Sequence, residues 1–302
     1  MFTSFKEAED FVLSNNVKKR LVLCGSHDDA ALEAVIAAHN KGIIEGILIG
    51  DEKKTRELVS KLGANQDDFR YINEPDEVLS ANVGIKMVRD GEADIPMKGL
   101  MQTSTYIRAV LNKETGILKK GNLLSCYNVI EYARQNRLLF IADPAISVNP
   151  RVEDKVKIIH NTVEGAKCFG FEKPKVAVLS AVEKVNPKLQ SSVDAEALNN
   201  MEWNDCVVQG PLALDNALDS QAAKHKGITG PVAGRADILI ASDLNMGNVL
   251  AKASHYFGGF VMAGVMCGAD YPIVATSRTE SPEGKYYSIL FAILESLTKN
   301  SK

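Results

Sequence analysis

Short runs of β-branched and other apolar residues alternate with amphipathic helical patterns along this 302-residue chain. The first run covers residues 21–25, helical spacing follows over 31–40, and residues 46–50 form the next run. The rhythm continues to an amphipathic helical pattern over residues 284–298. This alternation is typical of βαβ units, so it predicts an α/β protein with largely parallel sheets and helices on their faces. A chain of this length predicts two domains of about 150 residues each, or one large domain.

The composition excludes several kinds of partner and compartment. Lysine and arginine number 35 against 38 aspartate and glutamate, and the net charge of -3 predicts no binding to nucleic acid or to an anionic membrane. Acidic residues occur early and no run of about 18 apolar residues follows, which predicts neither a secretory signal nor a membrane span. The five cysteines are scattered and form no C-x-x-C pair. We therefore expect reduced thiols in a cytoplasmic protein rather than disulfides or a zinc cluster.

Polar residues after the predicted strands are the candidates for chemistry. Ligands of parallel α/β sheets bind beyond the carboxyl ends of the strands, where helix N-termini present backbone N–H groups. Ser277 and Arg278 follow the apolar run at 272–276. A guanidinium next to a hydroxyl matches the oxygens of an oxyanion such as phosphate. A surface arginine at the end of a loop explains this spacing equally well.

The loop after residue 97 is a second candidate for anion binding. Lys98 and Gly99 leave the strand, and glycine permits close approach of a ligand to the backbone. Thr103 or Ser104 can cap the helix that follows, and Arg108 lies about one turn into it. The pattern G-x-x-x-x-G-K-[ST] is absent, so this is not a Walker loop. An ordinary capped helix with a solvated arginine fits the same residues.

A third candidate follows the apolar run at 236–241. Asp243 and Asn245 leave the strand, and Gly247 and Asn248 lie where a helix opens. Backbone amides at such a place can hold a phosphate or one edge of a substrate, although an N-capped βα loop is the commoner structure. No G-x-G-x-x-G fingerprint, no G-x-S-x-G nucleophile elbow and no H-x-x-x-H pair occurs.

Six segments in this order resemble the phosphate acetyl/butyryltransferase family. They lie within residues 96–281 and read PMKGLMQTSTYIRAVLN, FIADPAISVNP, KVAVLSAVEKVNPK, QGPLALDNA, AAKHKGITGPVAGRADILIASDLNMGN and PIVATSRTES. The MKGL-x-x-TS, VNPK and GPLALDNA patterns resemble the butyryl branch, whereas SDLNMGN is closer to the acetyl branch. The butyryl branch commonly has histidine where this chain has Cys126.

The resemblance implies reversible transfer of a short-chain acyl group between coenzyme A and inorganic phosphate, by direct attack in a ternary complex. Acyl-CoA and phosphate would be the substrates, with no metal and no other cofactor. It implies two α/β domains like those of the isocitrate and isopropylmalate dehydrogenases, with the active site in the cleft between them. Residues 1–137 and 264–302 would form one domain and residues 138–263 the other. Family members are commonly homo-oligomers of two or more chains.

The resemblance also assigns roles to the candidate residues. Arg108 and Arg278 would hold phosphate, and Ser277 would donate to the tetrahedral oxyanion, where one positioned donor is worth about 2.7–4 kcal/mol. The CoA thiol, with a pKa near that of free cysteine at about 8.5, needs a base in the reverse direction. The acetyl branch has an aspartate shortly after its Ser-Arg pair, but this region here reads TESPEGK. Glu280 or Glu283 would replace it, or the base lies elsewhere.

Three alternatives stay open. Butyryl transfer is favoured over acetyl transfer, but pocket volume decides chain length and one methylene is worth only about 1–3 kcal/mol. A metal- and nicotinamide-dependent hydroxyacid dehydrogenase would share the architecture, yet it needs metal-binding aspartates and a nucleotide loop that the sequence lacks. A non-catalytic protein that binds CoA or a phosphorylated ligand is the third, because the aspartate is missing.

Overall fold

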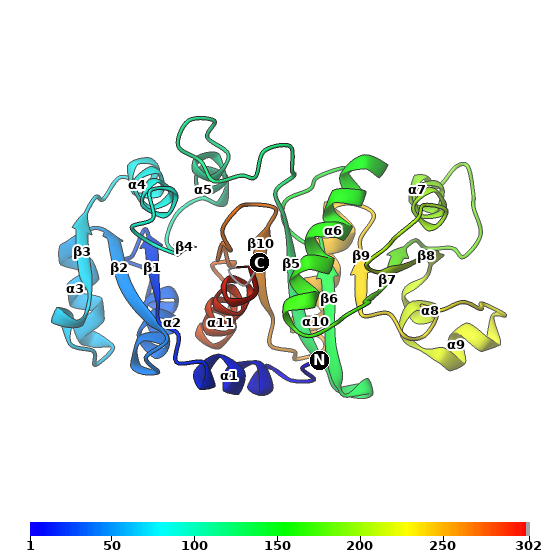
Figure 1. The fold of residues 1–302 in the computed structure, drawn as a ribbon, viewed down its shortest axis with the longest axis horizontal. Coiled ribbons are helices and arrows are strands. Elements are labelled where there is room, and N and C mark those ends of the chain that lie inside the picture. Colours follow the sequence, from blue (N-terminus) through cyan, green and yellow to red (C-terminus); the bar gives the residue numbers. More distant parts are fainter. Residues whose placement is uncertain (300–302) are drawn as a thin grey trace. The chain divides into compact units, whose positions relative to one another are not determined.

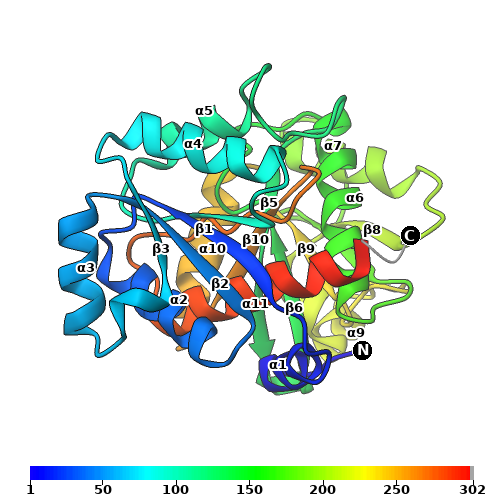
Figure 2. The same cartoon turned by 60° about the vertical axis from the view of Figure 1, so that its left-hand side comes forward.

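The computed structural model describes residues 1–299, and the chain divides into two compact units. Unit 1 comprises Met1–Ser4 and Leu123–Met262, and unit 2 comprises Phe5–Asn122 and the chain from Ala263 onward. Strands alternate with helices in both units and most strand pairs are parallel, so the predicted α/β class is confirmed (Figures 1 and 2). None of the helices within residues 1–299 is both long and apolar enough to cross a lipid bilayer.

Unit 2 contains a parallel four-stranded sheet in the order β3-β2-β1-β4. Its strands are β1 (Lys19–Cys24), β2 (Ile44–Gly50), β3 (Arg70–Asn73) and β4 (Ile95–Lys98), with β10 (Ala263–Cys267) as a further strand of the unit. Its helices are α1 (Phe5–Ser14), α2 (Asp29–Asn40), α3 (Glu52–Lys61), the 3-10 turn η1 (Gln66–Asp68), α4 (Glu77–Arg89), α5 (Thr103–Val110) and α11 (Pro282–Lys299).

The strand order of unit 2 reverses at β1. Right-handed crossovers therefore place α2 and α3 on one face of the sheet and α4 on the other. Helix α11 packs beside α2, and α5 packs beside α4 (Figures 1 and 2). Aspartates at positions 28, 51 and 76 cap α2, α3 and α4 by accepting backbone N–H groups of the first turn. The reversal makes the carboxyl ends of β1 and β4 the topological switch point, where ligands of such sheets bind.

Unit 1 contains strands in the order β5-β6-β9-β7-β8. The first pair is antiparallel and the others are parallel. The strands are β5 (Ser125–Tyr132), β6 (Arg137–Ala142), β7 (Lys175–Leu179), β8 (Val207–Leu212) and β9 (Ile238–Ile240). The helices are η2 (Ala133–Gln135), α6 (Val152–Cys168), α7 (Gln190–Asn199), α8 (Leu214–Leu218), α9 (Ser220–His225) and α10 (Leu244–Tyr256). Residues 123–137, which the sequence prediction placed in the other domain, belong here because β5 pairs with β6.

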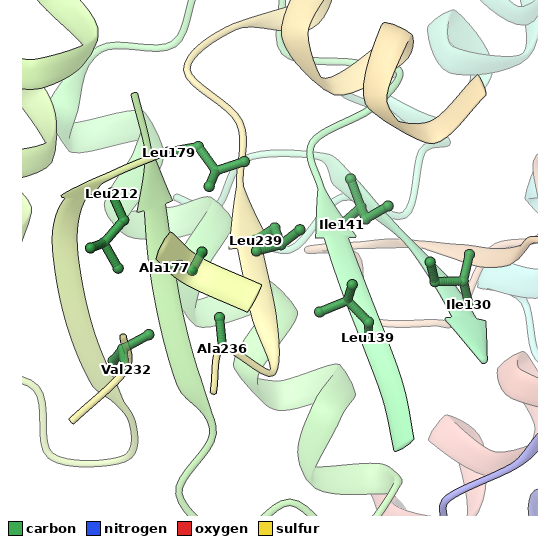
Figure 3. Packing of buried hydrophobic residues seen from close by; sticks show 10 residues of the cluster. Ile130, Leu139, Ile141, Ala177, Leu179, Leu212, Val232, Ala236 and Leu239 are labelled. Atoms are coloured by element: carbon green, nitrogen blue, oxygen red, sulfur yellow. The ribbon is translucent and has the colours of Figure 1, made fainter. Parts of the chain in front are cut away.

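One face of the unit 1 sheet is covered by a continuous apolar core. Leu139 and Ile141 of β6 lie two residues apart and therefore point to the same face, where Leu239 of β9 and Leu179 of β7 join them (Figure 3). Met246 and Leu250 of α10 pack against this cluster. The alternate residue Phe140 points to the other face and stacks edge-on against Phe169 and Phe171. Both faces are thus buried, as expected for a parallel sheet.

Candidate functional site

Two glycines, Gly25 and Gly99, allow the chain segments after β1 and β4 to pack closely at the switch point of unit 2. Gly25 follows β1 with a φ of +70°, and a Cβ atom there would lie 2.8 Å from the carbonyl oxygen of Leu100. A Cβ atom on Gly99, which follows β4, would lie 2.3 Å from the carbonyl oxygen of Gly25. The N–H of Gly99 donates to Cys24 and that of Leu100 donates to Gly25, both at 2.8 Å. Only glycine allows these two chain segments to pack so closely, which holds the residues beyond them on a defined edge.

A segment from the C-terminal part of the chain runs beside β4 and ends at the same edge. Val274 forms a parallel bridge with Met97, and its carbonyl accepts the N–H of Lys98 at 2.8 Å. The strand predicted over residues 272–276 is therefore reduced to isolated bridges. The pairing nevertheless carries residues 276–278 to the end of β4.

Ser277 and Arg278 lie in an exposed turn that contacts fix on both sides. The N–H of Ser277 donates to Oε1 of Glu280 at 3.0 Å, and its Oγ lies 3.1 Å from Oγ1 of Thr279. Nη2 of Arg278 donates to Oε1 of Gln102 at 3.0 Å. Within residues 1–299 the guanidinium forms no ion pair. The turn therefore presents a hydroxyl and a charged fork of donors at the surface.

Two buried lysines lie next to this turn. Lys285, in the first turn of α11, is 2% exposed, and its Nζ donates to Oγ1 of Thr276 at 3.0 Å and to the carbonyl of Ser277 at 2.6 Å. Lys98 is also 2% exposed, and its Nζ donates to the carbonyl of Gly99 at 3.2 Å. In the part of the chain that the structure describes, neither ammonium is paired with a carboxylate. We call Lys98, Lys285 and Arg278 the cation cluster.

The members of the cation cluster share one region, because Nζ of Lys285 donates to the carbonyl of Ser277, next to Arg278, and the N–H of Lys98 donates to the carbonyl of Val274. Burial, followed by the charge of Lys285, lowers the pKa of Lys98 to about 8; Arg278 adds to this effect, and Asp28 and Glu280 oppose it. Burial likewise lowers the pKa of Lys285. A buried cation with no carboxylate in direct contact is costly, and a bound anion would reduce that cost. The geometry therefore favours an oxyanion site over a surface arginine.

The start of α5 differs from the sequence prediction. The helix begins at Thr103, so Gln102 is its N-cap residue and makes no side-chain capping bond. The prediction that Thr103 or Ser104 caps the helix was wrong; both are exposed residues of its first turn. Arg108 is exposed in the last turn, about 7.5 Å of helix rise beyond Thr103. The structure thus joins Arg278 to the start of α5, through Gln102, and leaves Arg108 near its end.

The two candidate bases have different surroundings. One carboxylate oxygen of Glu280 holds the N–H of Ser277, which places this side chain within the turn. Glu283 is exposed in the first turn of α11 and forms no ion pair within residues 1–299. Of the two, only Glu280 is linked to Ser277 by a hydrogen bond.

In unit 1, Asp243 acts as the N-cap of α10. Its Oδ1 accepts the N–H groups of Asn245 at 2.8 Å and Met246 at 3.1 Å, and the hydroxyl of Ser242 donates to its Oδ2 at 2.8 Å. Burial raises the pKa of this carboxyl, but these hydrogen bonds outweigh burial and lower it below its ordinary value. Both oxygens of Asp243 are therefore used within the loop.

Gly247 and Asn248, two other residues predicted to bind substrate, contact the backbone of the neighbouring loop instead. A Cβ atom on Gly247 would lie 2.2 Å from the carbonyl oxygen of Asp143, so glycine is needed for close packing. Nδ2 of Asn248 donates to the carbonyl of Pro144 at 3.2 Å. Asn245 alone of the four predicted residues has an exposed side chain. The N-capped loop interpretation accounts for the other three.

Sequence reasoning missed two residues that organise these loops. Asp143 is buried and accepts N–H groups from Ala145, Ile146 and Ser147, together with the Ser147 hydroxyl. Its signal is an aspartate directly after a strand. Lys285 is the second, and its signal is a lysine one turn before Ile289 on the buried side of the last helix. Within residues 1–299, no group of three or more His, Cys, Asp or Glu could hold a metal ion.

Comparison with known proteins identifies the family. The model of the phosphate acetyl/butaryl transferase family matches residues 77–293. The chain is 41% identical over 298 residues to the phosphate butyryltransferase of Clostridium acetobutylicum, covering 97% of this chain and 98% of that protein. It is 36% identical over 275 residues to the phosphate acetyltransferase of Thermotoga maritima, covering 90% and 93%. The crystal structure of a branched-chain phosphotransacylase from Enterococcus faecalis V583 matches with a TM-score of 0.81 at 29% identity, covering 92% and 98%. The chain belongs to the phosphate acetyl/butaryl transferase family.

We expect a divalent oxyanion to bind more weakly as the pH rises from about 7 to about 9.5. Lys98 is charged below its pKa of about 8 and neutral above it, so the anion loses one cationic partner. A hydrogen bond to a charged group is worth about 1.5–3 kcal/mol, which predicts a loss of affinity of more than about tenfold. Sulfate is the probe, because it stays a dianion over this range, and calorimetry measures its Kd.

Lys98→Met should weaken sulfate binding at the lower pH and flatten the pH dependence. Lys53→Met, which removes an exposed lysine of α3, is the control and should behave as wild type. A wild-type Kd that is the same at both pH values would contradict the assignment of Lys98.

Proposed function

We propose that this protein is a phosphate acyltransferase that transfers a butyryl group reversibly between coenzyme A and inorganic phosphate. The observation that carries the proposal is the exposed Ser277–Arg278 turn, in a chain of this family, beside two buried lysines that form no ion pair within residues 1–299. Phosphate and acyl phosphate need concentrated positive charge, which Arg278 and Lys98 supply. We favour butyryl over acetyl because this chain is 41% and 39% identical to the phosphate butyryltransferases of two Clostridium species. Its identity to the phosphate acetyltransferase of Thermotoga maritima is lower, at 36%.

The reaction proceeds by direct transfer between the two bound substrates. A phosphate oxygen attacks the thioester carbonyl, a C–O bond forms, and the C–S bond breaks as the tetrahedral intermediate collapses. Arg278 orients the phosphate, and the Ser277 hydroxyl donates to the oxyanion that develops. Holding both substrates together supplies the proximity that such a reaction needs, so no covalent enzyme intermediate is required.

A base takes the CoA thiol proton in the reverse direction. We assign this role to Glu280, because its carboxylate is hydrogen-bonded to Ser277 at the turn, and Glu283 is the alternative. Arg108, Thr103 and Ser104 on α5 are assigned to further substrate contacts from the family resemblance, as is Asn245 in unit 1. The proposal includes no metal or cofactor, so turnover should survive EDTA. A cytoplasmic location belongs to the proposal, because the five cysteines are scattered along the chain and form no C-x-x-C pair.

Release of free CoA thiol from butyryl-CoA should require phosphate, and Arg278→Ala should lower kcat/KM for phosphate at least about 100-fold. Removal of one positioned donor at a developing charge costs about that much. Arg89→Ala, which removes an exposed arginine at the end of α4, is the matched control and should leave turnover unchanged.

A panel of acetyl-, butyryl- and longer acyl-CoA substrates separates the butyryl from the acetyl assignment. Folded wild-type protein that turns over none of them would reject the proposed activity. Saturable CoA binding in calorimetry, without turnover, would instead support the non-catalytic alternative.

Helix α10 supports a homo-oligomer. Val249, Tyr256 and Phe257 are 66%, 65% and 92% exposed, and their spacing of seven and eight residues places them on one side of the helix. A second copy of the chain would cover this side, because soluble monomers rarely expose contiguous apolar surface. Each aromatic side chain buries about 150–250 Å², so two supply about 300–500 Å² of the roughly 800 Å² that one partner contributes to a standard interface.

The oligomer proposal predicts a mass above that of one chain in light scattering coupled to size exclusion. Phe257→Glu should reduce the mass toward a single chain, because it would place a charge inside the contact. Met201→Glu, at an exposed position after α7 of unit 1, should leave the mass unchanged. A monomeric wild-type protein would contradict the proposal.

A further inference from the structure

Lys285 is a buried group of unit 2 that the reaction scheme leaves without a role. We propose that Lys285 is a positioning residue that fixes the Ser277–Arg278 turn in the shape that binds phosphate. The proposal rests on the proposed function, because it concerns the geometry of the same site.

The hydrogen bonds of Lys285 support positioning rather than direct substrate contact. Two of its three N–H donors are committed to the chain, one to the hydroxyl of Thr276 and one to the carbonyl of Ser277. Since Glu280 holds the N–H of Ser277, both backbone polar groups of that residue are fixed by side chains. The catalytic hydroxyl is therefore attached to a backbone that is held from two directions.

The position of Lys285 on α11 explains how it reaches the turn. Helix α11 begins directly after Ser281. The hydroxyl of Ser281 accepts the N–H of Gly284 at 3.1 Å, and its carbonyl accepts the N–H of Lys285 at 3.0 Å. These contacts close the stretch from residue 276 to residue 285 into a compact loop. Because α11 packs against α2, the loop is anchored to the body of unit 2.

Electrostatics argue that this lysine is not present for stability. Its ammonium is almost fully buried and lies near Lys98, and the first turn of a helix disfavours positive charge. The charges of Glu280 and Asp28 favour the charged form, but burial outweighs them and lowers the pKa of Lys285. An apolar side chain of similar length would fill the same space without these costs. A charged group at such a place is typical of a functional site, where a residue that lowers stability serves activity.

Lys285→Met is the direct test. We expect kcat/KM for phosphate to fall about 100-fold, as a displaced catalytic group would cause, with a raised KM for phosphate and an unchanged KM for butyryl-CoA. The melting temperature should not fall, because the substitution removes a buried charge. Lys53→Met is the control for loss of a lysine charge and should keep wild-type kinetics.

A double-mutant cycle gives a second readout. Thr276→Val removes one acceptor of Lys285 while keeping the side-chain shape, so it should lower kcat/KM by a smaller factor. In the Lys285→Met background it should have almost no further effect, since the contact is already lost.

Three outcomes would overturn the proposal. Wild-type kinetics in a folded Lys285→Met variant would reject the positioning role. Fully additive effects of Lys285→Met and Thr276→Val on kcat/KM would reject it as well. A fall in kcat that merely follows a fall in melting temperature, with both KM values unchanged, would assign a structural role instead. Wild-type protein without phosphate-dependent turnover would refute the proposed function itself, and the positioning role with it.

Discussion

The backbone pairing of Val274 with Met97 joins a segment from the C-terminal part of the chain to β4, which lies in its first third. Without this contact the Ser277–Arg278 turn would not lie at the end of the sheet where Lys98 emerges. The glycines at 25 and 99 fix that edge further, since each allows the backbone to approach where any side chain would collide. The backbone pairing places the turn at the end of the sheet. Glu280 and Lys285 then hold the turn in its conformation by hydrogen bonds to the backbone of Ser277.

The edge of unit 2 that contains the cation cluster differs from the rest of the protein in how its buried lysines are compensated. Elsewhere in the described chain, the buried Lys155 is paired with Asp194 at 2.6 Å. In the cation cluster the two buried ammonium groups contact only neutral oxygens. Such an arrangement is unfavourable in the absence of a ligand and becomes favourable when an oxyanion binds. The contrast between these two kinds of buried lysine separates a structural ion pair from a binding site within one protein.

The sequence predicted elements such as β1, α2 and α11 from their apolar periodicity, and it placed Lys98 and Arg278 at strand ends. It missed α1, although Phe5, Ala8 and Val12 recur there at helical spacing, and it missed the short β3, where apolar spacing is weak. It placed the cap of α5 at Thr103 or Ser104 because their chemistry suits that position. In the structure the N-cap residue of α5 is Gln102, which makes no side-chain capping bond, so side-chain chemistry does not indicate where this helix begins. Lys285 escaped notice because a lysine within an amphipathic helix normally lies on the solvated side. Only coordinates show that its side chain returns to Ser277.

The central claim is that phosphate binds at the Ser277–Arg278 turn beside the buried lysines. A crystal structure of the protein with bound inorganic phosphate measures this directly. The account predicts a phosphate whose oxygens lie within hydrogen-bonding distance of Oγ of Ser277 and of the Arg278 guanidinium. A well-ordered phosphate bound at another place, with this turn unoccupied, would contradict it.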